Sequence, residues 1–261
     1  MLLSSVVIIL REVLEGAILL SVLLALSSQR DISLRWSLPA LLLGSIGATG
    51  YAANFETIAA WFDYVGQDIA NATLHLLIVL SLTAFAILHQ VYERSHNNAI
   101  IACMILAVAF TVVREGSEII LYLSGYMNNS EVFPSVMLGG IIGSGIGASI
   151  GTLLYYALSC FLINSARKIA YLLLSLFAAG MSLHVVTMLT QADWMASGHS
   201  LWDTSGWIDE SSLTGQLLYA VTGYESTPNA NQVIAYIAGI LLLLLLPRLL
   251  KKGFEVYEAK S

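Results

Sequence analysis

Residues 11–15 read Arg-Glu-Val-Leu-Glu and lie in the middle of an otherwise uncharged apolar run that covers residues 1–26. The pattern returns at residues 114–118 as Arg-Glu-Gly-Ser-Glu, inside a second apolar run. A charged side chain at the centre of a bilayer-length segment costs about 3 kcal/mol or more, so such residues usually face a bundle interior and serve a function. The two stretches therefore predict a bundle of membrane-spanning helices with a polar site inside it.

The composition around these stretches is that of a polytopic membrane protein. The chain has 261 residues, of which 57% are apolar and 11% are charged, and its mean hydropathy is +0.80. Lipid cannot satisfy backbone polar groups, and the apolar segments are too long for barrel strands. We therefore predict an all-α fold, residues 1–261 forming one transmembrane domain of seven helices, at approximately 2–27, 36–57, 69–91, 98–125, 134–163, 168–192 and 230–250.

The loops differ in charge, and this difference predicts the orientation. Cytoplasmic loops carry an excess of Lys and Arg, and alternate loops here contain Arg30 with Arg35, Arg94, and Arg167 with Lys168. The C-terminal tail is also basic, through Arg248, Lys251, Lys252 and Lys260. We therefore expect the N-terminus outside and the C-terminus inside. The outer side then holds nine of the seventeen acids and is suited to attract cations: Glu56, Asp63, Asp68, Glu131, Asp193, Asp203, Asp209, Glu210 and Glu225.

The sequence repeats itself weakly. A shift of 103 residues places Arg11 on Arg114 and Gly44 on Gly147. Each unit contains three helices, an odd number, so we predict an inverted repeat of residues 1–97 and 98–192. An outer loop at 193–229 and a last helix at 230–250 follow it. Inverted repeats place the substrate site near the membrane midplane, at the repeat interface, and support alternating access.

Two further segments carry predictions about packing. Gly139, Gly143, Gly147 and Gly151 recur at four-residue intervals, a stripe of small residues that lets another helix approach closely. The stripe leaves open packing within the chain or between copies in a homo-oligomer. In the outer loop, residues 212–221 are mostly apolar and predict a short re-entrant or interfacial helix.

The repeated stretches predict a cation site. Residues three and four apart share a helix face, so Glu12 and Glu15 point together and Arg11 can reach Glu15. If the two stretches face each other, four carboxylates and two guanidiniums carry a net charge of −2, which a cation, protons or both must neutralise. Carboxylates suit hard cations such as ferric iron, Mn²⁺, Mg²⁺ or Ca²⁺. The alternative is a structural ion-pair network that only locks the two helices together.

Other polar residues in the spans are weaker candidates. His184 and Met181 are possible accessory ligands, as are His75 and His89, but a lone polar residue in a span more often makes an interhelical hydrogen bond. A membrane enzyme using buried carboxylates would need a second catalytic constellation, and the sequence contains none, so we predict a protein that is not an enzyme.

Paired R-E-x-x-E motifs in the first and fourth of seven helices resemble the oxidase-dependent iron permeases. These are the fungal high-affinity iron permeases and the bacterial permease of a three-component elemental-iron uptake system. The likeness extends to Phe-Ala-Ala-Gly at 177–180 with Trp194, and to a late stretch from 202–205 through Gly223 and Tyr224 to Pro228 and Tyr236. The resemblance implies an iron importer with these metal ligands and essential arginines: Glu12, Glu15, Glu115 and Glu118, with Arg11 and Arg114.

The resemblance also implies partners and a location. Iron, as Fe²⁺ or Fe³⁺, would be the transported substrate and not a permanent cofactor. An extracytoplasmic oxidase or peroxidase and an iron-delivery protein would act in trans, at a bacterial inner membrane, and we expect membrane lipid but no nucleic acid as a further partner. Where the family often has an E-x-x-E pair, this chain has Asp68 and Asn71, so Asp68 is an accessory candidate only. The alternative function is import of another hard or divalent cation, such as Mn or Pb, by the same site.

Overall fold

The structure is a computed structural model, and it describes residues 1–91, 97–160 and 163–258. Within these ranges the regular secondary structure is helical, apart from one isolated bridge between Ser200 and Asn229. This confirms the all-α prediction. The elements are α1 (Leu2–Ser28), the 3₁₀ helix η1 (Leu34–Trp36), α2 (Ser37–Ala53), α3 (Phe55–Ala59), α4 (Gly66–Val91), α5 (Asn97–Ser124), α6 (Phe133–Cys160), α7 (Ile163–Gln191), α8 (Leu213–Thr222), α9 (Ala230–Leu244) and α10 (Leu246–Glu258).

Five helical segments in the described part of the chain are long and apolar enough to cross a membrane. They are α4, α5, α6, most of α7, and α9 with the first part of α10. The helix α1 has 27 residues, but Arg11, Glu12 and Glu15 interrupt its apolar sequence. The helix α2 has 17 residues, slightly fewer than the roughly 20 that a crossing needs. The prediction of seven crossings therefore depends on these two helices.

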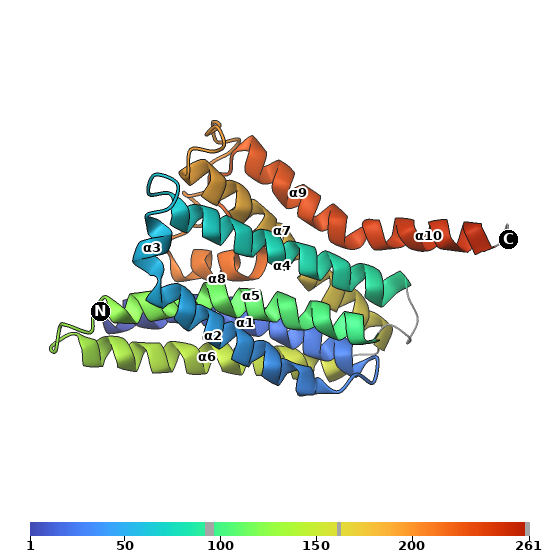
Figure 1. Cartoon of the computed structure of the whole chain (residues 1–261), viewed down its shortest axis with the longest axis horizontal. Helices are drawn as coiled ribbons and strands as arrows, with labels where there is room; N and C mark the ends of the chain where they lie inside the picture. The colour runs from blue at the N-terminus through green and yellow to red at the C-terminus, as the bar shows by residue number, and fades with distance from the viewer. Residues whose placement is uncertain (92–96, 161–162, 259–261) are drawn as a thin grey trace.

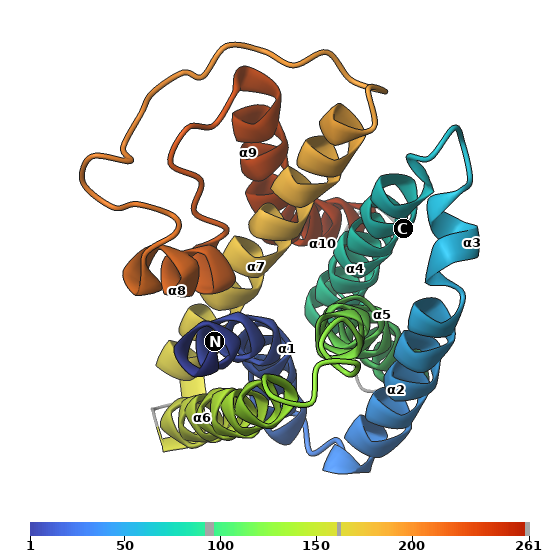
Figure 2. The ribbon, with the colours of Figure 1, turned by 90° about the vertical axis from the view of Figure 1, so that its left-hand side faces the viewer.

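The long helices form one bundle (Figures 1 and 2). Along it, α1 packs on α6, α2 on α5, α4 on both α5 and α7, and α7 on α9. Consecutive long helices run in opposite directions, so α1 and α5 are antiparallel (Figure 1). Large buried apolar side chains from α1, α4 and α5 form the core between them, among them Leu23, Phe85 and Met104.

Glycines set the closest helix contacts. A Cβ atom built on Gly143 of α6 would lie 2.5 Å from the carbonyl oxygen of Val6 in α1. On the other side of the bundle, a Cβ atom on Gly44 of α2 would lie 2.5 Å from the Cβ of Val112 in α5. Only a residue without a side chain fits at either place. The predicted close packing is confirmed, and the stripe of α6 packs within the chain, against α1.

The last long helix is broken inside the segment predicted at 230–250. α9 ends at Leu244 and α10 begins at Leu246, turned away from α9 in Figure 1. Pro247 lacks an N–H group and its ring clashes with the carbonyl four residues earlier, which breaks the hydrogen-bond ladder at this point. The sequence predicted one helix at 230–250, whereas the structure divides this segment, and the second part, α10, packs against α4.

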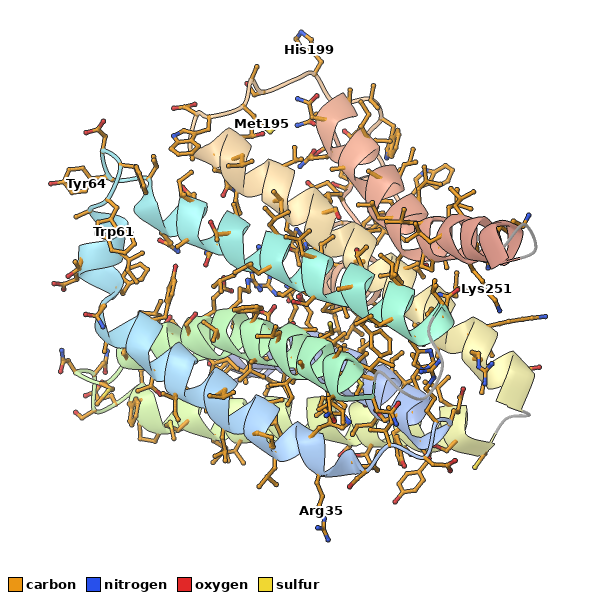
Figure 3. The ribbon with its side chains drawn as sticks, turned by 45° about the vertical axis from the view of Figure 1, so that its right-hand side comes forward. Arg35, Trp61, Tyr64, Met195, His199 and Lys251 are labelled. Carbon is orange, nitrogen blue, oxygen red and sulfur yellow. The ribbon has the colours of Figure 1, made fainter. Side chains whose placement is uncertain are left out.

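The two ends of the bundle differ. Figure 3 shows Trp61, Tyr64 and Met195 at one end, called here the loop end, while Arg35 and Lys251 lie toward the other, called the basic end. Arg94 and Lys260, two of the basic residues from which the orientation is predicted, lie outside the described residues.

The predicted short helix in the outer loop is confirmed as α8. The Oγ atom of Ser212 caps its start by accepting a hydrogen bond from the backbone N–H of Gly215 at 3.0 Å. Its end is set by Gly223, whose φ of +67° is in the left-handed region that favours glycine. α8 packs against α1 and α7, so the segment at 193–229 contributes a helix to the bundle.

Candidate metal centre

The two R-E-x-x-E stretches come together between α1 and α5. Arg114 of α5 is 4% exposed, and its Nη1 atom lies 3.2 Å from the Oε2 atom of Glu12 in α1. The same guanidinium pairs with Glu115 beside it, and its Nη2 atom lies 3.0 Å from the Oε1 atom of Glu118 one turn later. Arg114 thus orients one carboxylate from α1 and two from α5.

Arg11 lies at the edge of this group. Its Nε atom donates to the Oε1 atom of Glu12 at 2.9 Å, and its Nη2 atom is 3.9 Å from the Oε2 atom of Glu118. The side chain is 30% exposed, and its guanidinium carbon lies 5.5 Å from the ring centroid of Tyr219 in α8. Arg11 therefore pairs with Glu12 and Glu118 and lies over the ring of Tyr219, and the expected Arg11–Glu15 pair is not formed.

Three carboxylates are arranged as a metal could use them. Glu12, Glu115 and Glu118 each offer an oxygen, and these oxygens all lie within 4.8 Å of one another. Oxygens that bind one hard cation at about 2.0–2.6 Å lie within roughly 5 Å of one another. Glu12 and Glu115 are buried, whereas the side chain of Glu118 is 31% exposed. The group therefore has a dry side and a side that a cation can approach.

The fourth carboxylate, Glu15, completes the charge of the centre. It is 1% exposed, and neither of its carboxylate oxygens has a hydrogen-bond donor among the described residues, nor does Oε1 of Glu115. Burying such oxygens without a partner costs free energy. The four carboxylates and two guanidiniums carry a net charge of −2, so protons or a cation must compensate it. Glu15 lies outside the group of three whose oxygens are within 4.8 Å.

His184 of α7 forms a second buried polar layer. The ring centroid of His184 lies 5.4 Å from that of His75 and 4.7 Å from that of Tyr219. The hydroxyl of Tyr219 lies 3.3 Å from Nδ1 of His184. Tyr219 thus stands between His184 and Arg11, a role that its sequence position does not reveal. The signal available was a tyrosine within the apolar segment 212–221.

The remaining accessory candidates lie apart from the carboxylates. Met181 is part of the apolar core. Asp68 is half-buried in the first turn of α4, and the side-chain oxygen of nearby Asn71 accepts a hydrogen bond from the hydroxyl of Tyr51 at 3.2 Å. Neither Asp68 nor His184 belongs to the group of acidic oxygens described above.

A cavity of about 460 Å³ adjoins the centre. Glu12 and Glu115 line it, and it continues along α1 past Gly16 to Leu24, with α2 and α6 contributing other walls. A Cβ atom built on Gly16 would meet nothing within 4 Å. The buried carboxylates are therefore connected to open space that extends toward the C-terminal end of α1.

Comparison with known proteins gives one family and several relatives. The sequence model of a family described as "Iron permease FTR1 family" matches residues 2–253. The chain is similar to "Ferrous iron permease EfeU" of Escherichia coli O6:H1 (strain CFT073), with 22% identity over 92% of this chain and 94% of that protein. It is also similar to "Putative inactive ferrous iron permease EfeU" of Escherichia coli (strain K12), with 24% identity over 51% of this chain and 48% of that protein. No solved structure matches the chain.

Proposed function

The chain belongs to the iron permease FTR1 family, and from this premise we propose that it imports iron through a site made by the carboxylates of both R-E-x-x-E motifs. It is a multi-pass inner membrane protein and a transporter of iron, not an enzyme. The proposed ligands come from α1 and α5, and the proposed positioning residues are the two motif arginines: Glu12, Glu15, Glu115 and Glu118, with Arg11 and Arg114.

The observation that carries this proposal is the uncompensated charge between α1 and α5. Glu15 is buried with two carboxylate oxygens that have no donor among the described residues. A purely structural ion-pair network would balance acids with bases, whereas this one has two acids in excess. Arg114 keeps the carboxylates of Glu12, Glu115 and Glu118 oriented and close together, so the site needs little rearrangement when iron binds.

We further propose the topology that the sequence predicts. It has seven crossings, the N-terminus outside and the C-terminus inside, with inverted repeats at residues 1–97 and 98–192, an outer loop at 193–229 and a last helix at 230–250. The packing supports it. The repeat equates α1 with α5, α2 with α6 and α4 with α7. Exchanging the repeats turns the pair α1–α6 into the pair α5–α2, and both pairs pack closely.

In this orientation the 460 Å³ cavity provides the inner part of the route. It leads from Glu12 and Glu115 along Gly16 toward the basic end. Iron attracted by the acidic loop end binds the carboxylates, and a change in the relative position of α1 and α5 releases it into the cavity. Iron delivery by an oxidase or peroxidase and a carrier protein in trans is part of the proposal and rests on family membership. The two relatives are named as ferrous iron permeases, which favours Fe²⁺.

The test is uptake of ⁵⁵Fe by cells that express the protein as their main iron importer. Glu12→Gln, Glu15→Gln and Glu115→Gln should each lower the uptake rate at least about tenfold, as expected when a metal site loses a close oxygen partner. Asp31→Asn, at an exposed acid between α1 and η1 and outside the nine acids of the loop end, is the matched control. Unchanged uptake in the three variants at equal expression would refute the proposed site. Competition by Mn²⁺ and Pb²⁺ separates iron import from the alternative cations.

A further inference from the structure

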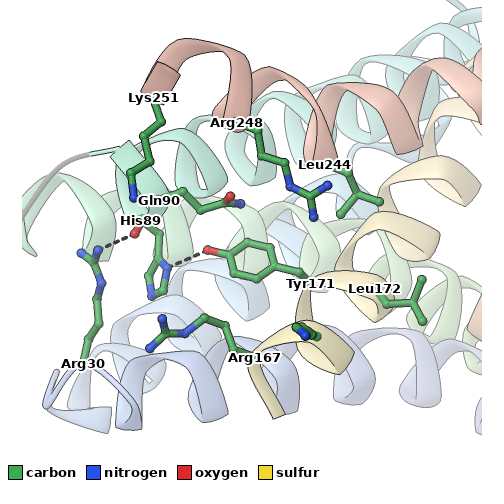
Figure 4. Close-up of a pocket in the computed structure, with 10 residues that line it drawn as sticks. Arg30, His89, Gln90, Arg167, Tyr171, Leu172, Leu244, Arg248 and Lys251 are labelled. Carbon is green, nitrogen blue, oxygen red and sulfur yellow. Dashed lines mark hydrogen bonds between the residues drawn. The ribbon is translucent and has the colours of Figure 1, made fainter. Parts of the chain in front are cut away.

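A second cavity lies at the basic end, away from the carboxylates. Its volume is about 900 Å³, and Figure 4 shows it between α4, α7 and α10. Among the described residues that line it, five are cationic and none is acidic: the cations are Arg30, Arg167, Lys168, Arg248 and Lys251. Cationic side chains from three separate parts of the chain therefore meet around one space.

The floor of this cavity is fixed by hydrogen bonds. Tyr171 of α7 and His89 of α4 are both buried, and the hydroxyl of Tyr171 lies 2.6 Å from Nδ1 of His89. Arg30 donates a hydrogen bond to the backbone carbonyl of His89. Figure 4 shows the side chains of Arg248 and Lys251 extending from α10 toward this floor. These hydrogen bonds hold the floor in place, and the cations converge on the space above it.

Three of the cations around the cavity have no acidic partner among the described side chains. These are Arg167, Arg248 and Lys251, and none of them forms an ion pair with an acid at residues 1–91, 97–160 or 165–252. Like charges around one space repel each other. A phosphate group relieves this repulsion and accepts paired hydrogen bonds from arginine. The volume is in the range of sites that enclose a ligand, and basic pockets between membrane helices bind phospholipid head groups.

We propose that this cavity binds a phosphate-bearing anion through Arg167, Arg248 and Lys251. The chemistry is shared by an anionic phospholipid head group and by a soluble phosphate compound. The apolar surroundings favour the lipid, because Leu172 lines the cavity and is 53% exposed, and Leu249 beside Arg248 is also exposed. Acyl chains can leave the cavity over these leucines. A bound head group joins α10 to α7 and so stabilises the segment that follows the break at Leu245.

The experiment uses the full-length protein in nanodiscs of phosphatidylcholine, with and without phosphatidylglycerol, and measures Tm together with retained lipid by native mass spectrometry. Phosphatidylglycerol should raise the Tm of the wild type. In the double variant Arg248→Gln/Lys251→Gln, each lost cation should weaken lipid binding about fivefold, hence about 25-fold together. Arg35→Gln, an exposed cation of η1 outside the cavity, should behave as the wild type.

A charge-preserving variant and a soluble probe complete the test. Arg248→Lys/Lys251→Arg should retain lipid binding, which separates the loss of charge from damage to the fold. Pyrophosphate added to phosphatidylcholine nanodiscs is the second arm. A rise in Tm with pyrophosphate but none with phosphatidylglycerol would overturn the lipid assignment. Equal lipid binding by the wild type and the Arg248→Gln/Lys251→Gln variant, or no effect of either probe, would overturn the site itself.

Discussion

Replacing Arg114 with glutamine tests whether the motif arginine holds the carboxylates in place. Arg114 is almost fully buried and pairs with Glu12, Glu115 and Glu118. Its loss changes the net charge of the centre from −2 to −3 without opening it to water. Removing one partner of a buried ion pair costs about 3–5 kcal/mol. We expect the free energy of unfolding to fall by that amount, measured by reversible unfolding in mixed micelles and followed by tryptophan fluorescence.

A second substitution separates this cause from a general loss of packing. Adding Glu115→Gln to the Arg114→Gln protein returns the net charge to −2. Because the two side chains are in contact, their effects should be non-additive, with a coupling energy of about 0.5–3 kcal/mol. Glu131→Gln, in an exposed loop, should give no such recovery. The reasoning is refuted if Arg114→Gln leaves stability unchanged, or if Glu115→Gln adds to the loss independently.

Three further results are expected. Gly16→Leu should fill the cavity beside the carboxylates and lower ⁵⁵Fe uptake. The free energy of unfolding should stay within about 0.5 kcal/mol of the wild-type value. Gly50→Leu, the control at another position with open space, should leave uptake unchanged. Gly143→Ala should destabilise the protein by about 1–3 kcal/mol in the same unfolding assay, since its Cβ would overlap the α1 backbone. Burial and the neighbouring Glu210 raise the pKa of Glu225 from 4.5 to about 7. The folded state therefore binds this proton more tightly than the unfolded state. The contribution of Glu225 to stability is complete below pH 4.5 and is lost as pH rises through about 7. Glu225→Gln should remove this decrease from a profile of Tm against pH.

The helices could be predicted from the sequence because lipid imposes a simple rule on length and polarity. The segment predicted at 98–125 is α5, Asn97–Ser124, and the one at 134–163 is α6, Phe133–Cys160. Errors arose where local chemistry interrupts a long apolar run. The sequence predicted one helix at 230–250, but the chain breaks at Leu245 and continues as α10, whose contact with α4 no local pattern indicates.

The meeting of the two R-E-x-x-E stretches followed from their charge, since neither can remain alone in an apolar surrounding. Which carboxylates each arginine pairs with did not follow from the charge. An arginine has several carboxylates within reach, and Arg11 pairs with Glu12 and Glu118 because Tyr219 of α8 occupies the space beside it. Tyr219 lies more than 200 residues after Arg11 in the chain. No local pattern predicts a contact over that separation, so this part of the centre needed the folded structure.

The glycine contacts of α6 and α2 determine how the molecule can deform. At Gly143 and Gly44 the partner helices interlock so closely that sliding one past the other would force backbone and side-chain atoms to overlap. α1 and α6 therefore move as one rigid unit, and α2 and α5 move as another. Each unit contains one helix from each half of the sequence. Glu12 and Glu15 belong to the first unit, and Glu115 and Glu118 belong to the second. A rotation of one unit relative to the other separates the two pairs of carboxylates. The boundary at which the protein moves therefore passes through the candidate metal centre.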